Sequence, residues 1–434
     1  MKKNMRKHIL GIVFALATLG AAAENEPHRK GSFSLTFTET DPLGDFKEMH
    51  RRNMPEFDEP GTGKNTAYAV DSRTFEVVVP DSYDPKVPAP LFVWVSAGNS
   101  GKMENPYRAS LDKRGFIYVG PNDAGNPVWP PFRYRSAIDA VYNMKKLYNI
   151  DARQVYFGGN SGGGRTASMG CIVYSDIFTG GGFYVIGCNF WDDLPGSKPG
   201  TFYPGFWKNR DAKLMKLAKN HSYVFLTGSK DFNRDGTIKA YNAYKKCAFP
   251  NLFYNETPGL AHATPPEADI EKAFAFLDKE LRSNALADCA AAEKLLRTYK
   301  YADAAQKAYV AKARAPEATA IWEKIVARAD NACDKATKTA KTPQEKIAKL
   351  KSTVKTYGLA AEKAQQEIER IESSPEFAAE NEAEARFQEI RKAARTTPRA
   401  ETVKALEELV AKYPNTSGAA KAAAVIKRMK AREP

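Results

Sequence analysis

The chain has 434 residues, which at roughly 150 residues each corresponds to about two or three domains. Hydrophobic residues make up 43% of it and aromatic residues 11%, enough to build buried cores, so wholesale disorder is excluded. Beyond the N-terminus no stretch approaches the roughly 18 apolar residues of a membrane helix, which excludes an integral membrane protein. The five cysteines are too few for a small disulfide scaffold.

The formal net charge is +14, and four of these charges come from basic residues among the first 23 positions. A basic excess can indicate a nucleic acid or an acidic surface as partner. From Ser283 onward 29 basic residues face 21 acidic ones, spread along the chain rather than clustered with stacking aromatics. This pattern favours a solvated helical surface, and we expect no nucleic-acid partner.

Residues 1–23 have the pattern of a secretory signal peptide. A basic start precedes an apolar run from Ile9 to Leu19, and small residues then end at Ala23, so cleavage is predicted before Glu24. The alternative is an uncleaved anchor, but the run is short for a membrane span. We therefore expect an exported protein, periplasmic or extracellular, with no transmembrane segment in the mature chain. Disulfides are permitted there, and Cys289 with Cys333 is the predicted pair.

Residues 24–66 are polar with little periodicity and are predicted to form an irregular leader. From residue 67 to 282 short apolar runs alternate with amphipathic ones. The predicted strands are Thr74–Val79, Leu91–Ser96, Phe116–Val119, Gln154–Phe157, Phe183–Ile186, Tyr223–Leu226 and Leu252–Asn255. The predicted helices are Ser136–Leu147, Gly163–Tyr174, Ala212–Asn220, Thr237–Cys247 and Pro266–Arg282. Nearly continuous apolar strands separated by helices predict an α/β domain with a mostly parallel sheet covered on both faces.

Residues 283–434 are rich in Ala, Lys and Glu and predict helices throughout. A segment that begins at Thr342-Pro343 is echoed by one that begins at Thr397-Pro398, about 55 residues later. Such an echo indicates either a small array of helix pairs or a plain helical bundle. The final pair, from Leu409 to Met429, resembles a tetratricopeptide-type helix pair, and this region is a candidate surface for a protein partner or a contact with the cell envelope.

The strongest chemical signal is the segment Gly-Gly-Asn-Ser-Gly-Gly-Gly at residues 158–164. It contains Gly159-x-Ser161-x-Gly163 directly after an apolar strand and before a helix-like run, which is the setting of a nucleophile elbow. The tight turn needs neighbours without side chains, and it places the serine hydroxyl at the N-terminus of a helix, where developing negative charge is stabilised. No Gly-Lys-Ser or Gly-Lys-Thr follows, which excludes a P-loop.

A serine nucleophile needs a base and an orienting carboxylate. The histidines after residue 23 are His28, His50, His221 and His262. His262 follows the last predicted strand, and Asp231 follows the strand before it, with Asp235 as the alternative acid. The order Ser161, Asp231, His262, each after a strand end, predicts a catalytic triad. No cluster of His, Cys and carboxylates has metal-ligand spacing, so neither a metal nor another cofactor is expected.

The elbow, the Gly228-x-x-Asp231 turn and the Gly-x-x-His262 loop resemble the α/β-hydrolase superfamily over about residues 75–281. Within it, the chain is most similar to secreted esterases of the polyhydroxybutyrate depolymerase and feruloyl esterase type. The resemblance implies an oxyanion hole made by the amide of Gly162 and by one amide from the loop after the third strand, predicted to be that of Ala97. The usual His-Gly pair of that loop is replaced by Ser-Ala here.

The pocket residues are less constrained by the sequence. The candidates to line it are Asn122, Trp129, Asn160 and Trp191. Buried loop packing is the alternative for the two tryptophans, and a structural hydrogen bond is the alternative for Asn160. Arg165, one turn after Ser161, either meets a substrate carboxylate or pairs with a nearby acid.

The predicted function is ester hydrolysis through an acyl-enzyme, on esters that include polymer- or carbohydrate-linked ones. The alternatives are a serine peptidase on the same fold and a non-catalytic binding protein that acts through the helical region.

Overall fold

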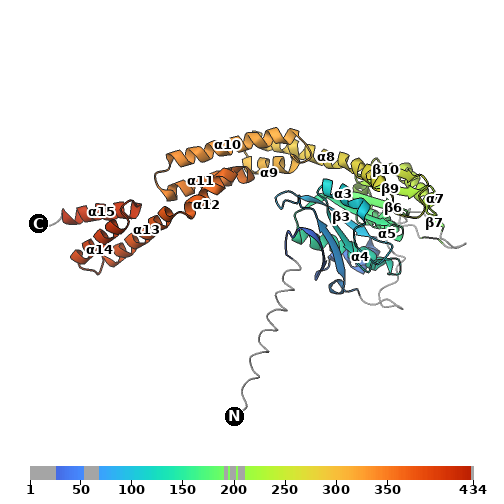
Figure 1. Cartoon of the computed structure of the whole chain (residues 1–434), viewed down its shortest axis with the longest axis horizontal. Helices are drawn as coiled ribbons and strands as arrows, with labels where there is room; N and C mark the ends of the chain where they lie inside the picture. The colour runs from blue at the N-terminus through green and yellow to red at the C-terminus, as the bar shows by residue number, and fades with distance from the viewer. Residues whose placement is uncertain (1–25, 53–67, 190–193, 196–201, 204–210, 432–434) are drawn as a thin grey trace, which may run out of the picture. The chain divides into compact units, whose positions relative to one another are not determined.

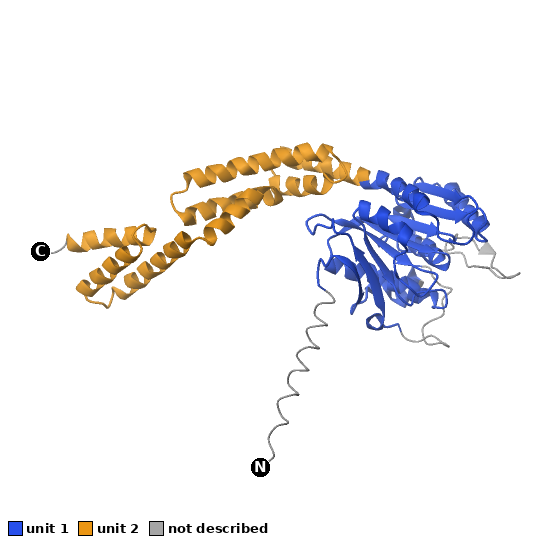
Figure 2. Ribbon diagram, viewed as in Figure 1, with its two compact units in different colours: residues 1–281 blue, residues 282–434 orange. Residues whose placement is uncertain are grey.

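The computed structural model describes residues 26–52, 68–189, 194–195, 202–203 and 211–431. The chain divides into two compact units, one up to Leu281 and one from Arg282 onward (Figure 2). The predicted signal peptide and Trp191 lie outside the described residues. Within the described part, no helix combines the length and the apolar character needed to cross a membrane.

The first unit is built on an eight-stranded sheet with the order β1-β2-β4-β3-β5-β6-β9-β10 (Figure 1). The strands are β1 (Gly31–Thr36), β2 (Thr74–Val79), β3 (Ala89–Val95), β4 (Ile117–Pro121), β5 (Ile150–Asn160), β6 (Gly181–Val185), β9 (Ser222–Gly228) and β10 (Leu252–Thr257). Only β2 pairs antiparallel to its neighbours, β1 and β4, and the other pairs are parallel. A separate ribbon pairs β7 (Leu194–Pro195) with β8 (Phe202–Tyr203). The main sheet has the topology of the α/β-hydrolase fold, as the resemblance implies.

Helices cover both faces of this sheet. They are α2 (Phe46–Arg51), α3 (Asn105–Lys113), α4 (Pro130–Leu147), α5 (Gly162–Val173), α6 (Ala212–Ala218), α7 (Arg234–Lys246) and α8 (Glu267–Arg297). Along β3 alternate side chains enter two different cores: Val93 lies in the core shared with α4 and α5, and Phe92 in the core shared with α3 and α8. Because both faces are buried, the strands read as continuous apolar runs.

All seven predicted strands and all five predicted helices of this unit are present, and all but β2 have shifted ends. The prediction that residues 24–66 are irregular is wrong for Gly31–Thr36, which form β1 and pair along the full length of β2. Phe33 is partly and Leu35 fully buried against the core, while the alternating Ser32 and Ser34 are exposed. A single edge strand with two apolar residues gives too short an alternation to stand out. The helices α2 and α3 were also absent from the prediction.

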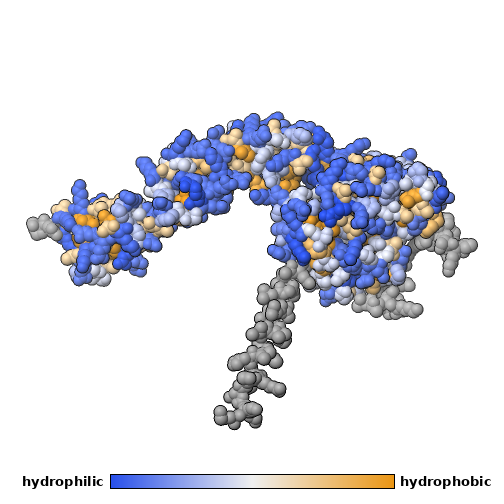
Figure 3. All heavy atoms as spheres, in the orientation of Figure 1, coloured by the Kyte–Doolittle hydropathy of each residue, from blue (hydrophilic) through white to orange (hydrophobic). Residues whose placement is uncertain are grey.

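The second unit is all helical, as predicted. Its helices are α9 (Tyr301–Ala311), α10 (Glu317–Thr339), α11 (Pro343–Tyr357), α12 (Glu362–Glu372), α13 (Pro375–Ala393), α14 (Arg399–Lys412) and α15 (Ser417–Lys430). The two echoed segments fold alike: α11 and α14 each end beside a tyrosine, Tyr357 and Tyr413, and each packs against the helix that follows. Hydrophilic side chains cover much of the visible surface of these helices (Figure 3).

The larger core of the second unit is assembled mostly from small side chains. Buried alanines line α9 and continue into α10, with Ile325 and Leu350 as larger members. Cys289 and Cys333 both belong to this core, yet each is a free thiol, so the predicted disulfide between them is wrong. Free cysteine is one of the residue types most often buried, and here both residues act as small apolar side chains.

Candidate active site

The turn between β5 and α5 holds Ser161 in a backbone conformation that non-glycine residues rarely adopt, with φ of 50° and ψ of −117°. The surrounding glycines allow this turn. A Cβ on Gly159 would lie 2.4 Å from the carbonyl carbon of Gly163, and one on Gly163 would lie 1.8 Å from the carbonyl oxygen of Val95. The glycines that identified the elbow in the sequence are therefore required by close backbone approach.

Ser161 lies within hydrogen-bond distance of a histidine that is in turn bonded to a carboxylate. His262 Nε2 is 2.8 Å from Ser161 Oγ, and His262 Nδ1 is 2.7 Å from Asp231 Oδ1. Asp231 follows β9 and His262 follows β10, so the ends of β5, β9 and β10 bring together three residues that are far apart in the sequence. The structure places the three residues predicted as a triad in the hydrogen-bonding order that the prediction requires.

Asp231 is buried, and hydrogen bonds hold both of its oxygens. The hydroxyl of Thr227 donates to Oδ2 over 2.9 Å, and the amide of Asn233 donates to Oδ1 over 2.9 Å. Bonds to the charged form compensate for removing a carboxylate from water. The alternative acid, Asp235, is exposed and pairs with Arg234 instead.

One ring covers the imidazole from the solvent side. Phe232, the residue after Asp231, stacks on His262 with 4.0 Å between ring centroids and 28° between planes. The Phe232 side chain is nevertheless 77% exposed, a rare position for a large apolar group. Phe232 was not among the predicted site residues, although an aromatic side chain directly after the predicted acid was a usable signal.

The region of the oxyanion hole differs in part from the prediction. Gly162 opens α5 directly after Ser161, and the side chain of Asn126 lies against it, because a Cβ on Gly162 would be 1.8 Å from Asn126 Oδ1. The amide of Ala97 donates to Asn160 Oδ1 over 2.9 Å. Ala97 can therefore serve an oxyanion only if this amide shares or releases its bond to Asn160.

Two of the pocket candidates are bonded within the protein. Asn160 uses its amide group to link Ala97 to Glu104, whose Oε1 accepts from Asn160 Nδ2 over 3.0 Å. Asn122 accepts from the amide of Gly101 and donates to two side chains of β2. For Asn160 this is the structural hydrogen bond expected as the alternative to a pocket role, and Asn122 is likewise held by hydrogen bonds within the protein.

Trp129 and Arg165 also make contacts within the protein. Trp129 packs on Phe46 and Phe132, which is the packing role. Arg165 donates to two asparagine side chains, Asn189 and Asn233, at 2.7 and 2.8 Å. Because Asn233 also donates to Asp231, Arg165 contributes to the frame behind the acid.

The groups around the site do not resemble a metal centre. In the described part of the chain no three His, Cys, Asp or Glu side chains gather as ligands would.

Burial raises the pKa of Tyr107 and of Tyr118 well above the usual value, and the nearby Glu104 carboxylate adds to both shifts. These tyrosines are therefore neutral at physiological pH.

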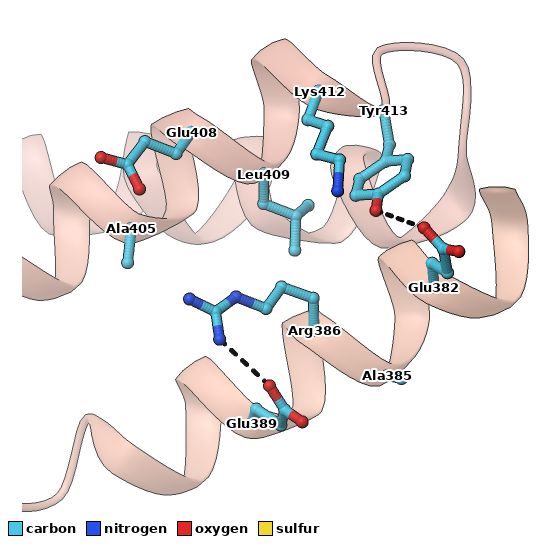
Figure 4. A pocket seen from close by; sticks show the side chains of 9 residues that line it. All are labelled: Glu382, Ala385, Arg386, Glu389, Ala405, Glu408, Leu409, Lys412 and Tyr413. Atoms are coloured by element: carbon cyan, nitrogen blue, oxygen red, sulfur yellow. Dashed lines mark hydrogen bonds and ion pairs between the residues drawn. The ribbon is translucent and has the colours of Figure 1, made fainter.

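The second unit has a groove of about 510 Å³ between α13 and α14 (Figure 4). Three of its charged side chains are hydrogen-bonded within the groove, because Arg386 donates to Glu389 and Tyr413 donates to Glu382. The lining contains no serine, cysteine or histidine, so the groove has no nucleophile–base pair.

The chain is similar to several solved structures. These include Est1E from Butyrivibrio proteoclasticus, at 15% identity and a TM-score of 0.34 over 48% of this chain and 94% of that one. A ferulic acid esterase matches at 15% identity and a TM-score of 0.39, over 58% of this chain and 98% of that one. A hyperthermophilic esterase from the archaeon Pyrobaculum calidifontis matches at 14% identity and a TM-score of 0.39, over 65% of this chain and 93% of that one. No protein-family model and no curated protein matches the chain. At such identities these proteins' activities do not transfer to this chain, whose function is argued from its own site.

Proposed function

We propose that the protein is a serine hydrolase that cleaves carboxylic esters through an acyl-enzyme. The observation that carries this proposal is the continuous hydrogen-bonded series from Ser161 Oγ through His262 to the buried Asp231. The serine in this series stands on a strained turn at the start of a helix. Nucleophile, base and orienting acid are the three parts that acyl transfer by serine requires.

The geometry supports the following sequence of steps. His262 Nε2 removes the proton of Ser161 as Oγ attacks the ester carbonyl, and the resulting imidazolium is stabilised by Asp231. The same Nε2 then returns its proton to the leaving alcohol, and water releases the acyl group by the reverse route. The amide of Gly162, at the N-terminus of α5, would donate to the oxyanion, and such a donor contributes roughly 3 kcal/mol.

The exposed face of the Phe232 ring favours an ester substrate that packs against this ring, next to His262. An exposed phenyl ring beside the base offers apolar contact area to a bound substrate, and covering it would gain about 25 cal/mol per Å² of apolar surface buried. Esters with an aromatic or extended apolar part are therefore the first substrates to assay.

The experiment compares the purified wild type with Ser161→Ala on short acyl and feruloyl esters. We expect hydrolysis in the wild type and a loss of about 10⁴-fold or more in kcat for the variant. Ser72→Ala, which removes an exposed hydroxyl whose bond is to the carbonyl of Ala69, is the matched control and should retain full activity. A folded Ser161→Ala variant with wild-type rates would refute the proposal, and Ser161-dependent turnover of amides alone would make the enzyme a peptidase.

Export is part of the same proposal and has its own test. N-terminal sequencing of the mature protein should begin at Glu24, after removal of residues 1–23. A mature chain that begins at Met1 would contradict export through a cleaved signal.

A further inference from the structure

Glu104 connects the nucleophile side of the site to the base side. Its Oε1 accepts from Asn160 Nδ2 over 3.0 Å, and its Oε2 accepts from the Thr264 hydroxyl over 2.5 Å. Asn160 directly precedes Ser161, and Thr264 lies two residues after His262. One carboxylate therefore joins two chain segments whose functional groups are 2.8 Å apart.

We propose that Glu104 is a positioning residue, which holds the His262 loop at hydrogen-bonding distance from Ser161. The expected effects on kcat and on probe labelling rest on the proposed function. The expected effect on the hydrogen bond between His262 and Ser161 does not.

The local structure shows that this carboxylate is not used for ordinary helix capping. Glu104 is the N-cap residue of α3, but its side chain makes no capping hydrogen bond to that helix. An N-cap side chain normally accepts from the amides of the first turn and stabilises the helix by about 1 kcal/mol. Here both oxygens are directed to Asn160 and Thr264 instead.

A carboxylate also fixes which way the Asn160 amide points. An ionised carboxylate only accepts, so Asn160 must present its NH₂ group to Glu104 and its oxygen to the Ala97 amide. The loop that contains Ala97 is thereby tied to the same carboxylate. Glu104 positions three segments: the loop after β3, the end of β5 and the loop after β10.

The His262 loop is anchored differently on its two sides. Toward Asp231 it is held by backbone bonds, since Lys230 donates to the carbonyl of Leu260, and by the amide of Gly259, which donates to Ser229. Toward Ser161, the hydrogen bonds among the described residues are that of His262 itself and the bond from Thr264 to Glu104. Loss of Glu104 should therefore loosen the contact to Ser161 and leave the contact to Asp231 intact.

The test uses Glu104→Gln and Thr264→Val in the full-length protein. Gln keeps the size of Glu104 but replaces one of its two acceptor oxygens with a donor NH₂ group. Val at position 264 removes the hydroxyl that donates to Glu104. Glu267→Gln is the matched control. Glu267 is exposed in the first turn of α8, three residues from Thr264, and its replacement by Gln makes the same change of charge.

We expect both variants to lower kcat, and the rate of labelling by a fluorophosphonate probe, about tenfold, with KM changed less than twofold. Glu104→Asp should recover part of the loss, and the control should match the wild type. A merely structural residue would instead lower the melting temperature without this division between kcat and KM.

A second readout needs no turnover. In protein labelled with ¹⁵N-histidine, and with His262 assigned by His262→Gln, the Nε2 signal of both variants should move toward its position in Ser161→Ala. The low-field proton signal of the Nδ1–H bond to Asp231 should persist. If the labelling rate and the Nε2 signal of both variants equal those of the wild type, the inference is overturned. If the wild type has no esterase activity, the proposed function fails, and the Nε2 signal still decides the role of Glu104.

Discussion

The sheet unit and the larger core of the helical unit are built from side chains of different size. The largest fully buried side chains, which include Trp94, Tyr107 and Tyr156, all belong to the sheet unit. The helical unit instead buries alanines such as Ala305 and Ala308 at contacts between helices. Large rings that interlock allow few alternative arrangements, whereas alanine contacts allow helices to approach closely and give little side-chain specificity.

The comparison also explains where chemistry can occur. Parallel strands end at one edge of the sheet, so loops from β5, β9 and β10 converge there and bring together residues that lie 101 positions apart. In the helical unit many ion pairs join exposed side chains, either on neighbouring helices, as in Lys363 with Asp334, or within one helix, as in Arg386 with Glu389. Exposed pairs of this kind contribute little to stability and do not bring a nucleophile and a base together.

After Ser161→Ala, the largest effect on kcat is expected for the acid of the triad. Asp231→Asn keeps the shape of the side chain but presents an amide to His262 Nδ1, which favours the wrong tautomer and removes the charge that stabilises the imidazolium. We expect kcat to fall by about 10³ to 10⁴-fold, measured with esters at pH 7 to 8. Asp235→Asn, at the exposed alternative acid, is the control. A larger loss in that control than in Asp231→Asn would contradict the assignment.

A pair of glycine substitutions separates the elbow from an ordinary helix position. A Cβ in Gly163→Ala would lie 1.8 Å from the backbone oxygen of Val95, so the turn must shift, and we expect several kcal/mol of destabilisation or loss of the site. Gly236→Ala on α7 meets no atom within 4 Å and should stabilise the unit by about 0.5–1 kcal/mol. Denaturant titration of both variants measures the difference, and equal midpoints would contradict the account of the elbow.

A pH-dependent stability is expected from the sheet unit. Burial lowers the pKa of His221 to about 4 from its ordinary 6.5, and its Nδ1 has no hydrogen-bond partner among the described residues. The unfolded chain therefore binds more protons than the native one between these values, so stability falls as pH drops from about 6.5 to 4, by roughly 2–3 kcal/mol. Comparing the melting temperature of His221→Gln with that of the wild type at pH 7 and pH 4.5 tests this. The wild type should lose more, and equal losses would exclude His221 as the cause.

The smallest expected effect tests whether the helical unit is independent of the chemistry. Ala308→Leu adds a branched side chain at a fully buried helix contact, which should cost about 1–3 kcal/mol in that unit. We expect an earlier thermal transition for the helices and an unchanged kcat for esters. A lower kcat in a variant whose sheet unit still unfolds at the wild-type temperature would show that the two units are energetically coupled.

The sequence predicted those features that depend on local pattern and on strand ends. The elbow could be predicted because its strand, its glycines, its serine and its helix follow one another directly in the sequence, and Asp231 and His262 because each follows an apolar strand. Glu104 and Asn126 gave no signal, because their importance arises from contacts with Thr264 and Gly162, distant in the sequence. The Cys289–Cys333 pairing failed for the same reason: spacing does not report which faces of two helices meet.

The most direct test of the central claim is labelling of the purified mature protein by a fluorophosphonate probe, with Ser161→Ala and His262→Ala as comparisons. The account predicts that the wild type reacts and that both variants, folded by circular dichroism, do not. Labelling that persists in Ser161→Ala, or a folded wild type that never reacts, would contradict the claim that Ser161 is an activated nucleophile.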